Sequence, residues 1–445
     1  MTGIIAETRR TAALALPIAA GHVGQMLMGW ADTMMIGHVG VTPLAACAFA
    51  NTLLMVPLVF GFGLLSAVSV RTSIAYGSED PAGCSAGLKG GWVMALLLGS
   101  IVAAVVALLA GFLDIFGQPP EVAAEAGPYL ILCGISSIAV MISTSAKNFA
   151  EALARPWVPF FIVLGSVLLN ILLNAALIYG LWGFPALGLT GAGWATLLAR
   201  ISGAAAMVSY PFLSRHLSSL ARVAVDKDRI SRELADQFRL GLPVGSMHLA
   251  EVTGFAVGSL MLGWIGINAL AAHQIAITCA ATTFMVPLGL SQAATVRVGQ
   301  ARGAGATDRC RLVAWGALGL ATVLMACFGL IFWLAGTPIA RLFNNDPPLI
   351  ALTAQLLVVA ALFQIFDGVQ IVSSGILRGF EDVRTPMLIG MVAYWVIALP
   401  VSYSLGFLFH LGAVGVWIGF CVGLAFAAAA LSSRVAHRLS ARTSD

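Results

Sequence analysis

The stretch between Glu251 and Arg297 contains no Asp, Glu, Lys or Arg. A transmembrane helix needs about 20 mainly apolar residues, so this stretch can hold the rest of one span, a glycine-rich turn at 263–268 and a second span. Glu251 itself lies inside the first of these spans. A carboxylate at bilayer depth costs about 2.5–3.5 kcal/mol on insertion scales, and such residues usually face a protein interior or a hydrated cavity and have a function. The stretch therefore predicts a membrane protein with a functional acid.

The composition agrees with this interpretation. Hydrophobic residues make up 60% of the 445 positions and charged residues 9%, against about 25% charged residues in soluble domains. The apolar runs have the length of helical spans and lack the alternation of an outer-membrane barrel, which predicts an all-α integral membrane protein. The net charge of +4 is small and the Lys and Arg are dispersed, so we expect no nucleic acid partner. The seven cysteines have no paired spacing and indicate neither a disulfide framework nor a metal site.

The two halves of the chain repeat one pattern at a constant displacement, so that many residues have a repeat counterpart in the other half. Matching pairs are Pro17 with Pro243, Arg71 with Arg297, and Cys84 with Cys310. Parallel repeats are typical of transporters whose substrate path lies between two halves. We therefore expect two six-helix lobes related by internal duplication, at 1–213 and 239–445, joined by a charged cytoplasmic linker at 214–238.

The apolar runs predict twelve spans. When the N-terminus is placed in the cytoplasm, every Lys and Arg except Arg200 and Arg341 lies in a terminus, or in or beside a cytoplasmic loop. Basic residues collect on that side of a membrane, so we expect both termini to be cytoplasmic in a multi-pass protein of the bacterial inner membrane. The expected spans are 14–38, 43–70, 88–113, 122–147, 157–180, 189–213, 239–263, 268–296, 311–336, 348–377, 386–406 and 412–434.

A polar cluster is expected in the N-terminal lobe. Asp32 in the first span shares a helix face with Gln25, and Asn170 and Asn174 lie four residues apart on one face of the fifth span. Thr196 in the sixth span can join them. An acid with two amides and a hydroxyl can hold a proton, because burial and hydrogen bonds decide between the charged and neutral forms. The structural alternative for the amides and the hydroxyl is interhelical hydrogen bonding alone.

The second expected cluster lies in the C-terminal lobe. Glu251 and Asp367 belong to spans 7 and 10, and Gln370 shares the helix face of Asp367. Two carboxylates with amide oxygens suit a hard cation such as Na⁺, and the same pair can share a proton, so both ions stay open. The sequence has no phosphate-binding GxxxxGK motif, so pumping must use an ion gradient or a partner ATPase. We expect no cofactor other than the coupling ion.

Pro17 is a candidate hinge in the first span. Proline lacks an N–H and crowds the preceding turn, so it can kink a helix. Because Pro17 shares its helix with Asp32, a kink there can be coupled to protonation of the acid. Tolerance of proline in membrane helices is the alternative explanation.

These motifs together resemble the multidrug and toxic compound extrusion (MATE) family, and within it the NorM-like bacterial branch. The resemblance covers nearly the whole chain. It is carried by MGWADTMMIGHVG around Asp32, NILLNAALIYG from Asn170, LPVGSMHLAEVTGF around Glu251 and DGVQIVSSGILRGFED from Asp367.

The resemblance implies a twelve-helix antiporter that exports cationic drugs and dyes in exchange for Na⁺ or H⁺ by alternating access. It also implies that the cluster around Asp32 is the family's N-lobe proton or substrate cluster, and that Glu251 with Asp367 is its C-lobe cation site. NorM-like proteins can carry a tyrosine one turn before the C-lobe aspartate. This chain has Phe363 there, so a cation bound at the site would lack that hydroxyl contact.

The expected partners are cationic small molecules and membrane lipid, and we expect a monomer. Methionines near Asp32 can pack adaptably against flat lipophilic cations. A lipid-linked sugar flippase of the same superfamily is the main alternative function, although a more cationic central cavity would be expected of it. A channel or an intramembrane enzyme is a further alternative, but no paired nucleophile and base stands out in the sequence.

Overall fold

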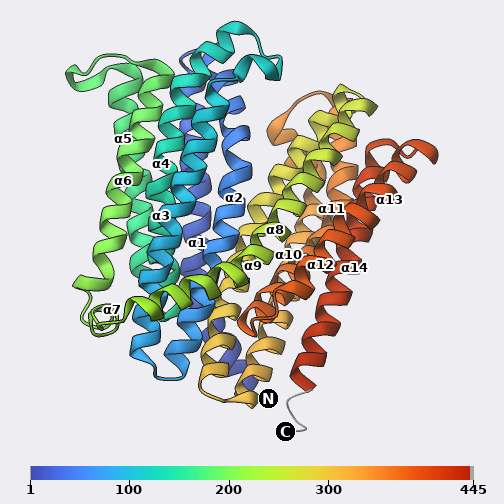
Figure 1. Cartoon of the computed structure of the whole chain (residues 1–445). Coiled ribbons are helices and arrows are strands. Elements are labelled where there is room, and N and C mark those ends of the chain that lie inside the picture. Colours follow the sequence, from blue (N-terminus) through green and yellow to red (C-terminus); the bar gives the residue numbers. More distant parts are fainter. Residues whose placement is uncertain (1, 441–445) are drawn as a thin grey trace. The chain divides into compact units, whose positions relative to one another are not determined.

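The computed structural model describes residues 2–440, and within that range the chain forms helices and short connections without a β-strand (Figure 1). Twelve segments of this range are long and apolar enough to cross a membrane, which confirms the predicted number and the all-α class. Eleven of these spans are single helices, α1 (Thr2–Gly37), α2 (Val41–Gly77), α3 (Pro81–Ala110), α4 (Pro120–Ala152), α5 (Trp157–Tyr179), α6 (Gly188–Leu213), α8 (Lys227–Ile265), α9 (Ile267–Gly303), α10 (Thr307–Phe343), α11 (Pro347–Gly379) and α14 (Gly412–Ser440). Short helices η1 (Leu113–Phe116), η2 (Leu181–Gly183) and α7 (Ser218–Ala221) lie in the connections.

Most helices are longer than the predicted spans. The clearest case is α8, which begins at Lys227, whereas the sequence places the start of this span at residue 239 and assigns 214–238 to a linker. Hydropathy detects only the part of a helix that needs hydrocarbon around it, and the charged first turns of α8 continue the helix beyond that part. The linker between the halves is correspondingly shorter than expected.

The remaining span, the eleventh along the chain, is irregular. It consists of α12 (Arg384–Met391), the π-helical η3 (Val392–Ala398), α13 (Leu399–Tyr403) and the π-helical η4 (Ser404–Leu408). Pro400 lies between the two π-helical segments and supplies no N–H to the helix, which is a common cause of such local rewinding. π-helical turns occur frequently at functional sites.

The chain packs as two compact units that differ from the duplicated halves. One unit contains Ala20–Gly245, and the other contains Met1–Ala19 with Ser246–Asp445. The first part of α1 therefore packs with the second half of the sequence, and the first part of α8 packs with the first half. The predicted lobes follow the duplication, whereas packing exchanges these two segments. Both boundaries fall shortly after the repeated prolines Pro17 and Pro243.

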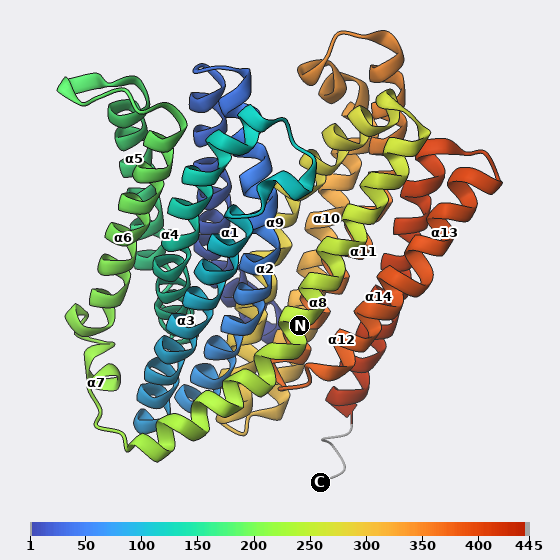
Figure 2. The same cartoon turned by 45° about the horizontal axis from the view of Figure 1, so that its top comes forward.

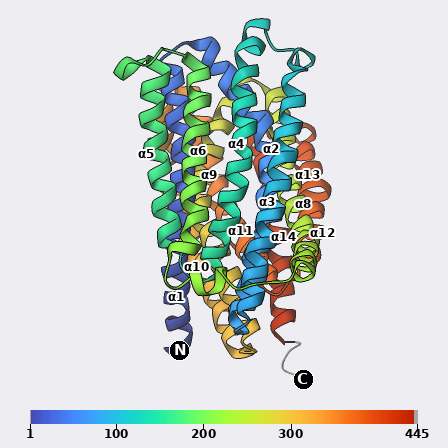
Figure 3. The same cartoon turned by 60° about the vertical axis from the view of Figure 1, so that its left-hand side comes forward.

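Within each unit one helix occupies the central position. In the unit of residues 20–245, α4 packs against α2, α3 and α6, while α5 lies beside α6 (Figure 3). In the other unit, α11 packs against α9, α10 and α14. The helices α4 and α11 are the fourth and tenth spans, so the central position is itself repeated. The packing of each unit therefore follows the duplication seen in the sequence.

The first part of α8 lies across α2 and α3 (Figure 2). Gln237 donates a hydrogen bond from Nε2 to the backbone oxygen of Gly87 at 2.9 Å. A Cβ atom at Gly241 would collide with the backbone oxygen of Leu64, so only glycine allows this approach. These contacts hold residues 227–245 firmly on their unit.

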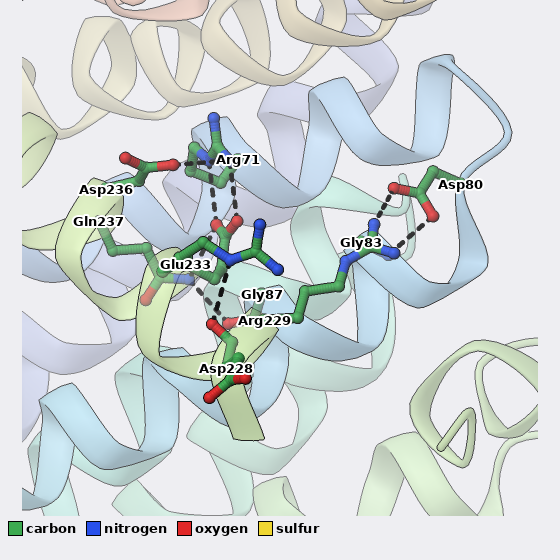
Figure 4. Close-up of polar contacts among 10 residues, drawn as sticks. Arg71, Asp80, Gly83, Gly87, Asp228, Arg229, Glu233, Asp236 and Gln237 are labelled. Atoms are coloured by element: carbon green, nitrogen blue, oxygen red, sulfur yellow. Dashed lines mark hydrogen bonds and ion pairs between the residues drawn. The ribbon is translucent and has the colours of Figure 1, made fainter. Parts of the chain in front are cut away.

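Two ion pairs at equivalent positions fasten the exchanged segments. Arg71 donates two hydrogen bonds to Glu233, from Nε at 3.0 Å and from Nη2 at 2.8 Å, and Asp236 lies 3.2 Å from the same Nη2 (Figure 4). In the other unit Arg297 pairs with Glu7. Arg297 is the repeat counterpart of Arg71, and Glu233 is that of Glu7, so the duplication extends to individual contacts.

Cys84 and its repeat counterpart Cys310 show the same repetition. Their thiols point to the backbone oxygens of Thr72 at 4.0 Å and Val298 at 3.9 Å, which are themselves a matching pair in the repeat. All seven cysteines are free.

Candidate functional site

The predicted N-lobe cluster is assembled within the unit of residues 20–245. Asp32 lies in α1, Asn170 and Asn174 lie on α5, and Thr196 lies on α6. Asn174 donates from Nδ2 to Asp32 Oδ1 at 2.5 Å and is 3.3 Å from Asn170 Oδ1. Thr196 Oγ1 donates to Asp32 Oδ2 at 3.5 Å and accepts from Asn170 Nδ2 at 3.4 Å. The four side chains thus form one hydrogen-bonded group around the carboxylate.

This group is shielded from the surroundings of the helices. Asp32 is 6% exposed, and the other three side chains are buried. Asn174 Oδ1 has no hydrogen-bond partner among the described residues, so the cluster keeps an acceptor for a proton donor or a ligand. Gln25, which was expected on the same face, is exposed and is not among the hydrogen-bond partners of Asp32. Its assignment to the site stays a prediction.

Arg200 adds a positive charge to this cluster. It lies on α6 one turn after Thr196, close enough to Asp32 for a favourable electrostatic interaction. Its Nη1 donates to Ser136 Oγ at 2.8 Å, which holds the guanidinium in place. The sequence placed Arg200 inside the sixth span, away from the cytoplasmic loops, and packing brings it near Asp32.

The predicted C-lobe acids come together in the other unit. Glu251 lies on α8 and Asp367 on α11, and the two carboxylates are close enough to interact electrostatically. His248 Nδ1 is 3.7 Å from Glu251 Oε2. Asp367 is 6% exposed and accepts no hydrogen bond from any described residue. Two carboxylates that interact in this way repel each other when both are charged, so the site favours a positive partner or a proton.

Tyr394 is a member of this site that the sequence did not identify. It lies in η3, and its hydroxyl accepts a hydrogen bond from Gln370 Nε2 at 3.1 Å. The same hydroxyl interacts electrostatically with Glu251 and Asp367. A tyrosine in an apolar span resembles any core aromatic residue. Only the packing of spans 7, 10 and 11 brings its hydroxyl to the acids.

Phe363 lies in an aromatic wall beside these groups. Its ring centroid is 6.1 Å from that of Phe255 and 5.6 Å from that of Trp417. Phe255 in turn contacts Tyr394 at 5.8 Å. Phe363 therefore packs the site but offers no oxygen to an ion.

The ligand chemistry of the C-lobe site is that of oxygen donors. Across residues 2–440, no group of three or more His, Cys, Asp or Glu side chains is arranged to hold a metal ion. Tyr394, which hydrogen-bonds to Gln370 and interacts electrostatically with both acids, adds a hydroxyl oxygen. Carboxylate, hydroxyl and amide oxygens suit hard cations rather than zinc.

Pro17, the candidate hinge, lies inside α1, which continues without interruption from Thr2 to Gly37. The boundary between the two compact units falls just after it, between Ala19 and Ala20. The position suits a hinge, although the bending itself stays a prediction.

Comparison with known proteins places the fold and the family. The sequence profile of the MatE family matches residues 17–176 and again residues 243–404, which supports the duplication independently. The chain is 35% identical over 434 residues to the probable multidrug resistance protein NorM of Pseudomonas putida, covering 96% of this chain and 93% of the relative. It is 36% identical over 443 residues to the protein of the same description in Mesorhizobium japonicum, covering 97% and 94%.

Solved structures show the same fold. A eukaryotic MATE transporter superposes with a TM-score of 0.88 at 22% identity, over 99% of both chains. An outward-facing multidrug resistance MATE transporter of the MOP superfamily superposes with a TM-score of 0.89 at 19% identity, over 98% of this chain and 96% of that one. The repeated profile match and the full-length relatives establish that this multi-pass membrane protein belongs to the MatE family, whose members are transporters and not enzymes.

Proposed function

We propose that the protein is a multidrug efflux antiporter, which exports cationic lipophilic drugs and dyes in exchange for Na⁺ or H⁺ by alternating access. The names of the relatives in Pseudomonas putida and Mesorhizobium japonicum support multidrug export. The observation that carries the proposal is the presence of a buried carboxylate cluster in each unit, around Asp32 and around Asp367. Both clusters favour positively charged partners.

The exchange follows from the cost of an empty acidic site. Glu251 and Asp367 lie within spans, where an unpaired charge is unfavourable. The site therefore takes up a small cation or a proton, and a drug cation satisfies the same requirement. Binding of one then weakens binding of the other, and such couplings are typically about 1–3 kcal/mol and reciprocal. An inward gradient of the small ion can drive the drug outward.

The N-lobe cluster adds a second exchangeable site. Asp32 can be charged or neutral within the same hydrogen-bonded shell, because Asn174 donates to it and can keep that contact in either form. We assign this cluster to proton exchange or to contact with the drug. Arg200 lies near Asp32, so a deprotonated carboxylate has a positive charge in its surroundings.

For localisation we propose the bacterial inner membrane, with both termini in the cytoplasm and with the chain acting as a monomer among membrane lipids. The basic residues support this orientation. Within their own unit, the start of α1 and the end of α14 lie at the same end, as Figure 1 shows. Two arginines of α10 contact these two helix ends. Arg309 lies 3.6 Å from Glu7 of α1, and Arg311 donates to the backbone oxygen of Leu439 in α14.

The proposal is tested by binding of a fluorescent cationic dye, ethidium, to the purified protein across Na⁺ concentrations and pH values. We expect at least one of the two ions to weaken dye binding in the wild type. The double variant Glu251→Gln with Asp367→Asn should lose most of this sensitivity. Full sensitivity in the double variant would exclude these acids as the site of exchange, and insensitivity of the wild type to both ions would refute antiport.

A further inference from the structure

His273 belongs to a buried polar group that lies outside both acidic clusters. It is on α9, less than two turns after the start of the helix, and it is 2% exposed. Its Nε2 is 2.9 Å from Ser259 Oγ of α8, and its ring meets that of Trp417 of α14 edge to face at a centroid distance of 5.7 Å. Three helices of one compact unit therefore build this group.

The hydrogen bonds of Ser259 determine which ring nitrogen of His273 carries the proton. Ser259 Oγ is 3.1 Å from the backbone oxygen of Phe255, which can only accept a hydrogen bond. A hydroxyl has one proton to donate, so this proton goes to Phe255, and His273 Nε2 must donate to Ser259. In the neutral ring Nδ1 then has no proton and keeps its lone pair.

This lone pair is unused in the structure. Nδ1 of His273 is buried and has no hydrogen-bond partner among the described residues, and the same is true of Nε1 of Trp417. Buried polar atoms in proteins nearly always have a partner, so a histidine that only joined helices would use both of its nitrogens. A bare imidazole nitrogen instead provides a place where a proton can bind.

Among the described residues no charged side chain acts on His273. Between the middle of the surrounding helices and the α8–α9 turn, the ionisable groups are His248 and Glu251 on α8, Cys279 on α9, Cys327 and Arg341 on α10, Asp346 and Asp367 at the start and in the middle of α11, and Cys421 on α14. None of them forms a hydrogen bond or an ion pair with the imidazole. A proton on Nδ1 therefore has to come from water and not from a neighbouring acid.

The internal duplication places this group where the other unit has its acid. Ser259 directly follows Gly258, which is the repeat counterpart of Asp32, and Trp417 is the counterpart of Gly193 in α6. At this place the first unit has a titratable carboxyl group. The second unit has an imidazole there instead.

We propose that His273 is an additional proton-binding residue of the C-terminal half, which takes up a proton on Nδ1 from the extracytoplasmic side and thereby weakens binding of the drug cation at the acid pair. This inference rests on the proposed function. One proton from external water binds the lone pair of Nδ1 and gives an imidazolium, while Nε2–H keeps its bond to Ser259. Release returns the same proton to water.

The position of the group suits this role. In the proposed orientation the α8–α9 turn is extracytoplasmic, so a proton from outside reaches the level of His273 before that of Glu251. Ser259 follows Glu251 by eight residues on α8, which is about 12 Å along the helix. At an effective dielectric constant of about 20, two positive charges separated by about 12 Å weaken each other's binding about tenfold.

Nitrogen-15 NMR of the purified protein with labelled histidine tests the protonation directly, and His273→Gln identifies the signals of His273. We expect the neutral ring to carry its proton on Nε2, and Nδ1 to become protonated as the pH is lowered from 8 to 4. A neutral ring with its proton on Nδ1 would overturn the inference, and so would an Nδ1 that stays unprotonated throughout.

Binding of ethidium at pH 8 and at pH 4, without Na⁺, tests the coupling to the drug. Glutamine can still donate from its amide to Ser259 but cannot take up a proton. The loss of affinity between pH 8 and pH 4 should therefore be about tenfold smaller in His273→Gln than in the wild type, with equal affinity at pH 8. His38→Gln is the matched control, because His38 is an exposed histidine directly after α1, and its profile should match the wild type.

The remaining outcomes also decide the matter. An unchanged pH profile in His273→Gln overturns the inference, and so does weaker binding already at pH 8, which indicates a structural role. If His273→Gln does not fold, Ser259→Ala removes the acceptor of Nε2–H, and a neutral ring that keeps its preference for Nε2 in this variant would contradict the argument. A wild type whose ethidium binding responds to neither Na⁺ nor acid refutes the proposed antiport, while the NMR titration still decides whether His273 binds a proton.

Discussion

The repeated ion pairs allow a quantitative test of how burial determines the contribution of an ion pair to folding stability. Arg297 and Glu7 have side chains that are 6% and 11% exposed, whereas Arg71 and Glu233 are 30% and 10% exposed. The two arginines occupy equivalent places in the duplication. Replacing each by methionine removes the same charge and leaves a glutamate behind in both units. The two pairs differ in the burial of the arginine and in their charged neighbours, because Asp236 lies 3.2 Å from Arg71 Nη2, whereas Arg309 and Arg10 lie beside Glu7.

Arg297→Met should be the more destabilising change. Removing one partner of a buried pair costs about 3–5 kcal/mol, because the remaining charge is left uncompensated. Arg309 and Arg10 also lie near Glu7, at 3.6 and 3.1 Å, but their side chains are exposed and can recover only part of this loss. For Arg71→Met we expect roughly 1–2 kcal/mol, between the buried value and the value of about 0–1 kcal/mol for surface pairs.

The assay is unfolding of purified protein in mixed micelles with increasing sodium dodecyl sulfate, followed by tryptophan fluorescence. Adding Glu7→Gln to Arg297→Met should restore part of the stability, since the orphaned charge is then removed, and the double-mutant cycle gives the coupling. The Arg71 pair should weaken with added salt more than the Arg297 pair does. Equal losses for the two arginines, or a larger loss for Arg71, would refute the assignment of stability to burial.

Three further predictions concern the site, the topology and the pH dependence of stability. Asp32→Asn keeps the shape and one hydrogen-bonding oxygen but cannot exchange a proton, so we expect loss of drug export with normal expression; wild-type resistance in drug-sensitive cells would contradict a proton role. A cysteine at position 341, in a variant without the exposed Cys327, should react with an impermeant thiol reagent only from outside the cytoplasm, and labelling from the cytoplasm would reverse the topology. Asp382 lies between two spans, and although burial acts to raise its pKa, hydrogen bonds from Arg438, Thr385 and Arg434 outweigh it and hold the pKa below its usual value. The contribution of the Asp382 carboxylate to folding stability is therefore present above the unfolded pKa of about 3.9 and is lost as the pH falls through the lower folded pKa. The difference in unfolding free energy between wild type and Asp382→Asn should be full at pH 6 and should shrink toward pH 3. A difference that does not change with pH would contradict this.

The sequence predicted those parts of the molecule that depend on local pattern. The twelve spans follow from apolar runs of sufficient length, and Asn170 and Asn174 could be paired because four residues on a helix bring side chains to one face. The start of α8 was missed because its charged turns carry no hydropathy signal. The exchange of the first parts of α1 and α8 between the units was also missed, since it depends on contacts between residues far apart in the chain, such as Arg297 with Glu7.

Tyr394 shows why the sequence alone could not predict every residue of the candidate site. Its ring fits the apolar pattern of the span. The groups that interact with its hydroxyl, Glu251 and Gln370, lie on other helices, so the sequence of the span alone does not identify them. The resemblance to NorM-like proteins pointed instead to Phe363, one turn before Asp367. The structure shows that Phe363 belongs to the aromatic wall.

The duplication produced two similar scaffolds but not two equal sites, and packing explains the difference. The repeat counterpart of Asp32 is Gly258, where a Cβ atom would collide with the ring of Phe420. In the sixth and twelfth spans, LGLTGAG at 187–193 aligns with LGAVGVW at 411–417, and the same alignment pairs Thr196 with Phe420. In one unit the Asp32 carboxylate lies 3.5 Å from the Thr196 hydroxyl. At the equivalent place in the other unit, the ring of Phe420 occupies the space beside Gly258.

The acid of the C-terminal half therefore stands elsewhere on its helix. Glu251 corresponds to Gln25, which is exposed, while Gly258 leaves no room for a carboxylate at the position that Asp32 occupies in the other half. Moving the acid two turns along the helix placed it next to His248, Tyr394 and Asp367 instead of an amide pair. The ring of Phe420, which occupies the space beside Gly258, also packs against Phe255 at a centroid distance of 5.0 Å, so the two halves of the repeat carry their acids at different positions along equivalent helices.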